Sequence, residues 1–174
     1  MTDTRSIKRA LERNTKAISL RPAVGLGTSI TRATVTNGCT CEITDGPWKF
    51  ISDLPESEGG TNQGPTPGVL GRGALVSCLA MGIVIRAAEM EIPLDSVAVE
   101  VHADWDARGY LGLGEGVPPG YTQLRVIVDI ISSASEERVR ELVAIAERLS
   151  PYVDAFRRGN DVRIDLRVAQ ATPA

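Results

Sequence analysis

Three cysteines are the side chains best suited to covalent chemistry in this sequence of 174 residues. Cys78 lies near the centre of residues 64–90, a stretch made mostly of apolar and small residues. Such a thiol is either a small buried hydrophobe or a nucleophile, and a nucleophile needs a neighbouring positive charge that stabilises its thiolate. On a helix, Arg72 would lie nearly opposite Cys78, and Arg86 about two turns beyond it. We therefore expect any activating charge to come from another part of the chain.

Cys39 and Cys41 fall on one face of an expected strand over residues 39–44, roughly 7 Å apart along it. That separation is awkward for a disulfide. We interpret them as a half-buried pair of small residues. The only histidine, His102, falls on a different expected strand. Because no second pair of Cys or His has usable spacing, we expect no metal site, and no motif indicates a cofactor.

Other familiar catalytic patterns are missing from the sequence. Asp104 and Asp106 flank Trp105 at the entrance of a loop, where solvated carboxylates are expected rather than an acid/base pair. The glycines at positions 112, 114 and 116 do not match the dinucleotide fingerprint, and no segment matches the phosphate-binding P-loop. No GxSxG motif marks a hydrolytic serine. Nucleotide-dependent and serine-hydrolase functions are therefore disfavoured.

Composition and charge narrow the choice of partners. The chain is 43% hydrophobic and 24% charged, which is ordinary for a globular protein with a sizeable core. Its net charge of -3 gives no electrostatic reason to expect nucleic acid or an anionic membrane surface as a partner. The sequence has no N-terminal apolar segment of the secretory type, and three cysteines do not make a disulfide framework. We expect a cytoplasmic protein.

The element that carries Cys78 is predicted to be a long helix. Pro65 and Pro67 hold the chain extended, so the helix is expected from about Gly68 to Met90, within a segment spanning residues 64–91. No face of this helix is polar along its whole length, which predicts burial on nearly every side. The uncharged run between Arg72 and Arg86 is too short to cross a bilayer, which disfavours a membrane span.

The residues before this helix predict a helical extension (1–24) and a β-meander (25–63). Asp3 or Thr4 is suited to cap a helix over residues 5–18, which ends at Arg21-Pro22. Alternation from about Gly27 predicts a strand that ends at the Asn37-Gly38 turn, followed by strands over residues 39–44 and 48–51. The polar, glycine-rich residues 53–63 are expected to form a loop.

The residues after the helix (92–174) predict a β-β-α-α-β half. Strands are expected over residues 96–105 and 121–131, joined by a long loop. A capping box at Ser133-Ala-Ser-Glu136 begins a helix, Ser150 caps a second one that runs to about Arg158, and residues 162–168 alternate as a final strand. Strands and helices come in blocks, so we predict one α+β domain over residues 1–174, with antiparallel sheet. A helix that is apolar all round indicates that a second subunit covers it.

Several of these segments resemble the OsmC and organic hydroperoxide resistance (Ohr) family. The residues concerned are Gly60-Thr61-Asn62, Gly64-Pro65-Thr66-Pro67, Leu75 to Leu79 and Ser150-Pro151-Tyr152. The resemblance implies an intertwined homodimer whose sheets enclose paired central helices. It also implies a peroxidatic cysteine at Cys78 that reduces organic hydroperoxides, a second cysteine that forms a disulfide with it, and a dithiol reductant that regenerates the thiol.

Three positions depart from what the resemblance implies. Ser150 stands at the place of the second cysteine, and a hydroxyl cannot form the disulfide that protects a sulfenic acid. Gly68 stands where active members carry a glutamate, and the activating arginine falls near Asn37, with Arg32 as a nearby substitute. Two functions follow from this pattern. One is weakened, one-cysteine hydroperoxide reduction at Cys78, and the other is an inactive dimeric module that binds a small apolar ligand at the subunit interface. In a variant of the first, Cys39 or Cys41 is the thiol that resolves an oxidised Cys78.

Overall fold

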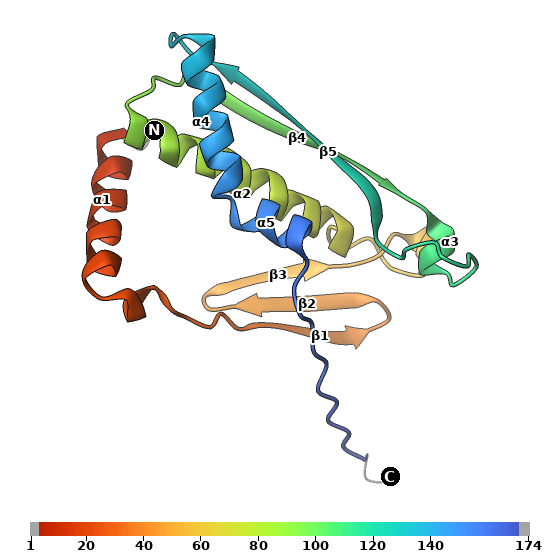
Figure 1. The fold of residues 1–174 in the computed structure, drawn as a ribbon. Coiled ribbons are helices and arrows are strands. Elements are labelled where there is room, and N and C mark those ends of the chain that lie inside the picture. Colours follow the sequence, from red (N-terminus) through yellow and green to blue (C-terminus); the bar gives the residue numbers. More distant parts are fainter. Residues whose placement is uncertain (1–3, 171–174) are drawn as a thin grey trace.

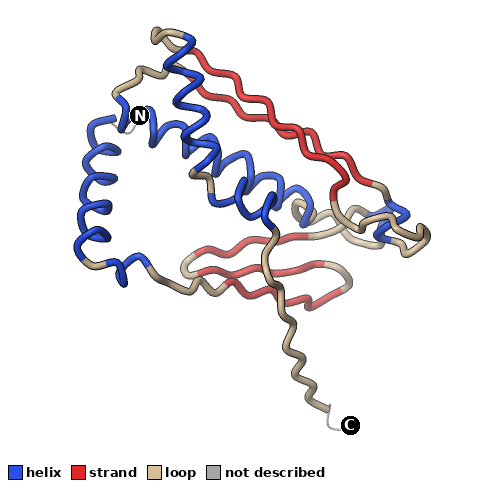
Figure 2. The backbone as a smooth tube through the Cα atoms, in the orientation of Figure 1, coloured by secondary structure: helices blue, strands red, loops and turns tan. Residues whose placement is uncertain are grey.

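The computed structural model describes residues 4–170 and contains five α-helices and five strands in that range (Figures 1 and 2). Helix α1 spans Thr4–Leu20, and a short 3-10 helix follows at Pro22–Gly25. α1 is thus somewhat longer than expected, but it still ends before Arg21-Pro22, where proline blocks continuation. The suggested cap at Asp3 lies outside the described residues.

The predicted meander forms a three-stranded antiparallel sheet. Its strands are β1 (Thr31–Asn37), β2 (Thr40–Asp45) and β3 (Trp48–Ser52), in the order β1-β2-β3. Cys39 was expected on the return strand but lies in the turn, next to Gly38 with its φ of +54°. The expected same-face pair of cysteines is therefore wrong, because the hairpin turn uses Cys39 itself.

A tightly held loop leads from β3 into the long helix. Its anchor is Asp53, which is 2% exposed and accepts hydrogen bonds from the Thr61 hydroxyl (2.7 Å) and from the backbone N–H groups of Thr61 and Gln63 (both 3.1 Å). The Thr61 hydroxyl, with these N–H groups and that of Leu54, lowers the pKa of Asp53 to about 2. The loop is thereby fixed to the end of β3.

Close backbone packing explains two of the glycines in this loop. A Cβ added at Gly60 would lie 2.0 Å from the carbonyl oxygen of Leu54, and one at Gly64 would lie 2.4 Å from that of Ile51. Any other residue would push the loop away from the sheet. These glycines therefore set the approach of the chain to the next helix.

Helix α2 spans Pro67–Met90 and has 24 residues. Thr66 caps it by accepting a hydrogen bond from the N–H of Val69 (3.4 Å), and it ends at Glu91 in a left-handed conformation. Within the single chain the expected burial on nearly every side is wrong. A stripe of five residues is buried (Leu75, Leu79, Ile83, Ala87 and Ala88), whereas Met81 is 59% exposed.

The second sheet is a long antiparallel hairpin of β4 (Ser96–Trp105) and β5 (Tyr121–Ile131). Val99 pairs with Val128 and packs on the core, while Glu100 and His102 are exposed, as the alternation predicts. The expected loop between the strands contains a short helix, α3 (Ala107–Tyr110). Figure 1 shows α2 between this hairpin and the β1–β3 sheet.

Helices α4 (Glu136–Arg148) and α5 (Pro151–Arg158) pack on α2. Leu142 and Ala146 of α4 join Leu79 and Ile83 in the main core. The predicted capping box is misplaced: Ser135, not Ser133, caps α4 by accepting a hydrogen bond from the N–H of Arg138 (3.4 Å). The predicted cap at Ser150 is present in α5.

The predicted final strand over residues 162–168 is wrong for the single chain. Residues 159–170 have no regular secondary structure and extend away from the rest of the molecule (Figures 1 and 2). A strand needs a neighbour that satisfies its backbone groups, and this segment has none within the described chain. The fold is α+β with antiparallel strands, as the block order of strands and helices predicts. The block order did not predict that the strands form two separate sheets.

Candidate functional site

Cys78 lies at the centre of α2, half-buried, next to the buried Leu79. Its sulfur is 3.6 Å from the hydroxyl oxygen of Ser150, at the start of α5. This distance is within hydrogen-bonding range for sulfur, and either atom can donate. The structure therefore brings together the two residues that the sequence singled out, although they are separated by 72 positions.

The hydroxyl of Ser150 has two partners. The side chain is 2% exposed, and its oxygen accepts a hydrogen bond from the N–H of Val153 (3.4 Å) while it contacts the sulfur of Cys78. The N-cap role fixes the serine at the first turn of α5, and Pro151 at the first helical position holds the chain in a helical conformation. The serine consequently faces Cys78 from a defined position.

The other residues considered for thiol chemistry are not joined to Cys78. Arg32 is exposed on β1, opposite Thr44, and has no hydrogen bond or ion pair with Cys78 within residues 4–170. Cys39 is exposed and Cys41 is half-buried on β2, and all three thiols are free. Within residues 4–170, no lysine or arginine side chain forms a hydrogen bond with Cys78.

Asp104 and Asp106 each pair with an arginine. Asp104 binds Arg125 across the β4–β5 hairpin, and a hydrogen bond from Arg108 to Asp106 (2.6 Å) lowers the pKa of Asp106 to about 2. Both carboxylates are thus held ionised, which does not suit acid/base catalysis near neutral pH. Among the described residues, no group of three or more His, Cys, Asp or Glu side chains could hold a metal ion.

A second polar cluster, at the first turns of α2, was missed by the sequence reasoning. The guanidinium of Arg72 donates a hydrogen bond to the hydroxyl of Tyr121 (3.1 Å) and lies 6.0 Å from the centre of its ring. The same hydroxyl donates to the carbonyl oxygen of Gly68 (3.2 Å). The spacing of Gly68 and Arg72, four residues apart, was the available signal that they share a helix face.

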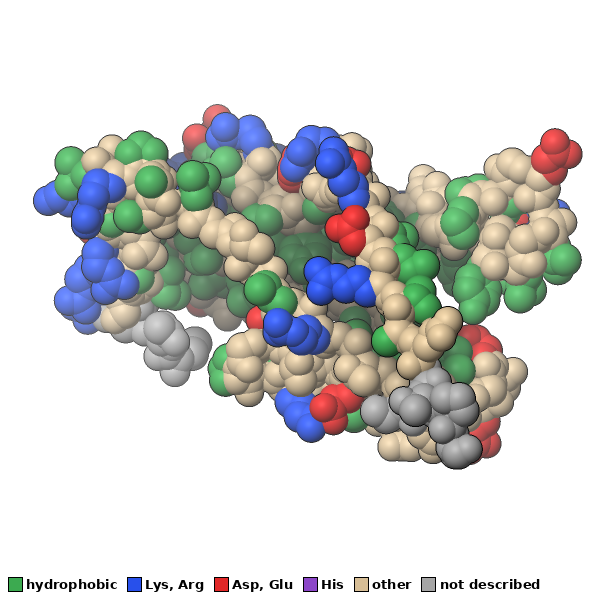
Figure 3. All heavy atoms as spheres, turned by 90° about the horizontal axis from the view of Figure 1, so that it is seen from below, with side chains coloured by type: hydrophobic (Ala, Val, Ile, Leu, Met, Phe, Trp, Pro, Cys, Tyr) green, Lys and Arg blue, Asp and Glu red, His purple; other side chains and the backbone are tan. Residues whose placement is uncertain are grey.

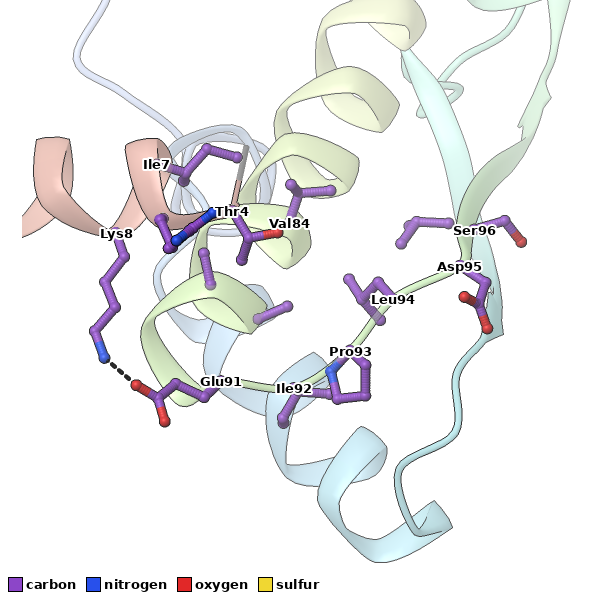
Figure 4. A pocket seen from close by; sticks show the side chains of 14 residues that line it. Thr4, Ile7, Lys8, Val84, Glu91, Ile92, Pro93, Leu94, Asp95 and Ser96 are labelled. Atoms are coloured by element: carbon purple, nitrogen blue, oxygen red, sulfur yellow. Dashed lines mark hydrogen bonds and ion pairs between the residues drawn. The ribbon is translucent and has the colours of Figure 1, made fainter. Parts of the chain in front are cut away.

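Two cavities lie at opposite ends of α2. One, of about 790 Å³, borders the Arg72–Tyr121 pair and the residues around α3. The other, of about 740 Å³, lies between α1 and the end of α2, where Lys8 and Glu91 form an ion pair of 2.5 Å at its edge (Figure 4). The Lys8 ammonium lowers the pKa of Glu91 by this contact. Neither cavity is lined by Cys78 or Ser150.

Comparisons with known proteins agree with the fold. A search of curated proteins gives no match. Among solved structures, an OsmC-like protein from Mycoplasma pneumoniae matches with a TM-score of 0.65 and 14% identity, over 76% of this chain and 89% of that one. An organic hydroperoxide resistance protein OsmC from Legionella pneumophila matches with a TM-score of 0.54 and 25% identity, over 76% and 90%.

A third solved structure points the same way. An organic hydroperoxide resistance protein from Elizabethkingia anophelis matches with a TM-score of 0.55 and 19% identity, over 77% of this chain and 91% of that one. The sequence profile described as "OsmC-like protein" matches residues 60–165, more than half of the chain, and this range includes both Cys78 and Ser150. This chain belongs to the OsmC-like family.

Proposed function

We propose that this protein reduces organic hydroperoxides through Cys78, by a one-cysteine mechanism, in defence against oxidative stress. The observation that carries the proposal is the 3.6 Å contact between the sulfur of Cys78 and the hydroxyl of Ser150. Membership of the OsmC-like family and the likeness to proteins named for organic hydroperoxide resistance support it. Hydroperoxide reduction at Cys78 is one of the two functions that the sequence leaves open.

The chemical step needs no metal or cofactor. The thiolate of Cys78 attacks one oxygen of the peroxide, an S–O bond forms as the O–O bond breaks, and the released alkoxide takes a proton and leaves as an alcohol. Cys78 is oxidised to a sulfenic acid while the hydroperoxide is reduced. The hydroxyl of Ser150 can donate a hydrogen bond to the thiolate before the attack, because it lies within reach of the sulfur.

Regeneration requires a reductant from outside the chain, because the sulfenic acid must take up two electrons, and Ser150 cannot form a disulfide first, so the reductant meets the sulfenic acid directly. We propose a small dithiol. Its first thiol condenses with the sulfenic acid, an S–S bond forms and water leaves. Its second thiol then attacks that bond, which returns Cys78 to the thiol and releases the reductant as a cyclic disulfide.

The test is turnover of cumene hydroperoxide with dihydrolipoamide as reductant. We expect Cys78→Ser to lower consumption to the uncatalysed rate, since the nucleophile is lost. The double variant Cys39→Ser/Cys41→Ser is the matched control and should keep the wild-type rate. Undiminished turnover in Cys78→Ser would rule out the mechanism, and lost turnover in the double variant would make Cys39 or Cys41 the resolving thiol.

The second candidate is a catalytically inactive module that binds a small apolar ligand at a subunit interface. Two observations favour it: Gly68 provides no carboxylate beside the helix start, and Arg32 forms no hydrogen bond or ion pair with Cys78 within residues 4–170. Alkylation by iodoacetamide separates the two functions. A thiol that reacts no faster than free glutathione at neutral pH, together with no consumption of hydroperoxide, would favour the module.

We also propose that the active form is a cytoplasmic homodimer, with α2 and the C-terminal segment covered by the second copy. Val69, Met81 and Val84 of α2 are exposed, and in residues 162–168 the apolar side chains reach 89% exposed at Ile164. Seen from the side of the β1–β3 sheet, hydrophobic side chains lie in the depth of a hollow (Figure 3). Exposed apolar surface on this scale is typical of an interface.

A membrane is the other environment that could cover α2. The uncharged run between Arg72 and Arg86 is short, but the whole helix Pro67–Met90 could cross a bilayer by length and composition alone, and the core helices of soluble proteins pass the same test. Light scattering after size-exclusion chromatography without detergent distinguishes the two. A dimeric mass supports the homodimer, whereas a monomeric mass, or a need for detergent, contradicts it.

A further inference from the structure

The cluster of Gly68, Arg72 and Tyr121 holds a positive charge that pairs with no acidic side chain in the described part of the chain. Arg72 is half-buried, and within residues 4–170 it forms no ion pair with Asp or Glu. Its guanidinium has five donors and stays protonated at any physiological pH. One donor is used by Tyr121, so several remain available to an anion that enters from solvent.

The cavity beside this charge has the size and lining of a small-molecule site. Its volume of about 790 Å³ falls in the range common for organic ligands. Trp105, Tyr110 and Leu111 line it with large apolar surfaces, and all three are mostly exposed in the chain, so a ligand could cover them. A single cation next to apolar side chains suits a ligand with an apolar body and one anionic group.

Two further features restrict the charge of that ligand. Glu58 also lines the cavity and is exposed, which disfavours a dianion such as a phosphate monoester. The start of α2 lies at the same cavity, through Thr66 and Gly68, and the partial positive charge of a helix start favours one negative charge there. A monocarboxylate satisfies both conditions.

Gly68 makes room for this arrangement. A Cβ added at this position would lie 3.2 Å from the guanidinium nitrogen of Arg72 and 3.5 Å from the hydroxyl of Tyr121. A longer acidic side chain there would meet the guanidinium and occupy its donors, as carboxylates and arginines do at short range. The absence of a side chain at Gly68 therefore leaves Arg72 available to a ligand.

We propose that the pocket between the start of α2, α3 and the start of β5 binds a small apolar monocarboxylate, with the carboxylate on Arg72 and the apolar part on Trp105, Tyr110 and Leu111. This binding is separate from the proposed hydroperoxide chemistry, because the pocket is not lined by Cys78. Its readout is ligand affinity, not peroxide consumption. Each proposal can therefore fail without the other.

The experiment is a titration with decanoate and, in parallel, with decanol, followed by the fluorescence of Trp105 in a Trp48→Phe background. Charge-assisted hydrogen bonds contribute about 1.5–3 kcal/mol, so decanoate should bind on the order of 10- to 100-fold more tightly than decanol. Arg72→Met should remove this preference, and Gly68→Glu should weaken decanoate because the new carboxylate competes for Arg72. Tyr121→Phe should weaken it by a smaller factor.

Arg86→Met is the matched control, because Arg86 lies on the same helix but pairs with Glu89 (2.6 Å). It should leave the preference for decanoate unchanged. Equal affinity for decanoate and decanol in the wild type would overturn the proposal. So would undiminished decanoate binding in Arg72→Met, with circular dichroism showing that the variant is folded.

Discussion

The first turns of α2 and its centre present polar groups in different ways. At the first turns, Thr66 caps the helix, Asp53 anchors the preceding loop, and Arg72, Tyr121 and Gly68 form a chain of hydrogen bonds. At the centre, Cys78 shares a hydrogen bond with Ser150 and is followed by the core residue Leu79. One end of the helix holds the fixed charge of Arg72, whereas the centre holds a thiol beside a hydroxyl.

The largest expected effect is that of Ser150→Cys, which should change the oxidation product of Cys78 at the centre of α2. A thiol at this position would replace a hydroxyl 3.6 Å from the sulfur of Cys78, close enough for a disulfide after a small adjustment. After one equivalent of hydroperoxide, intact-mass analysis should show loss of two hydrogens in the variant. The wild type should instead gain oxygen.

Ser135→Cys is the control for this change. Ser135 caps α4 as Ser150 caps α5, but it is exposed and forms no hydrogen bond with Cys78 within residues 4–170. Its variant should oxidise like the wild type. Failure of Ser150→Cys to form the disulfide would show that the two positions do not meet in the working protein.

Asp53→Asn tests how firmly the first turns of α2 are held. The amide would present N–H groups toward donors that now bind a carboxylate, so thermal stability at neutral pH should fall clearly. The pKa of Asp53 is about 2 in the folded protein, below its reference of 3.8. Its contribution is therefore complete above pH 3.8 and is lost as the pH falls toward 2.

Urea denaturation at several pH values measures both parts of this prediction. The variant should lose less stability than the wild type between pH 4 and 2, since one carboxylate with a lowered pKa is gone. Asp95→Asn, an exposed carboxylate at the other end of α2, is the control and should follow the wild-type curve. A parallel loss in wild type and Asp53→Asn would mean that other carboxylates govern acid unfolding.

Ser150→Ala should have a moderate effect on stability. It removes the N-cap of α5 and the polar neighbour of Cys78, and loss of an N-cap typically costs about 1 kcal/mol. The unfolding free energy in urea measures it, with Ser135→Ala as a cap variant away from the thiol. If only Ser150→Ala changes the rate of alkylation of Cys78, the serine influences the thiol as well as the helix.

The smallest expected effect is that of Gly68→Ala. The added methyl group would crowd the end of the flexible Arg72 side chain, which can shift, and the gain in helix propensity offsets this. We expect a change in unfolding free energy within about 0.5 kcal/mol. Gly71→Ala, where an added Cβ meets nothing within 4 Å, should be more stable than Gly68→Ala. A severe loss in Gly68→Ala would mean that Arg72 cannot move.

The sequence predicted best what depends on neighbouring residues. The alternation around Val99 placed β4 correctly, and the Ser150-Pro151 pair identified the start of α5, because period and capping are local properties. The resemblance then predicted that Cys78 and Ser150 meet, which no local pattern could show. The class of the fold followed from the order of the elements.

The errors and omissions concern partners distant in sequence or absent from the single chain. Residues 162–168 alternate like a strand but have no neighbour to pair with, so they stay extended. The turn was predicted at Asn37-Gly38, but Asn37 pairs with Thr40, so Gly38 and Cys39 form the turn. Arg72 and Tyr121 are 49 positions apart, and no periodicity links a helix residue to the first residue of a strand.

Trapping of the oxidised thiol tests the proposed mechanism at its first step. The wild-type protein is treated with one equivalent of cumene hydroperoxide in the presence of dimedone, which labels sulfenic acids, and the labelled residue is located by peptide mass mapping. The proposal predicts a single dimedone adduct on Cys78. An unlabelled Cys78, or a disulfide between Cys78 and Cys39 or Cys41, would contradict it.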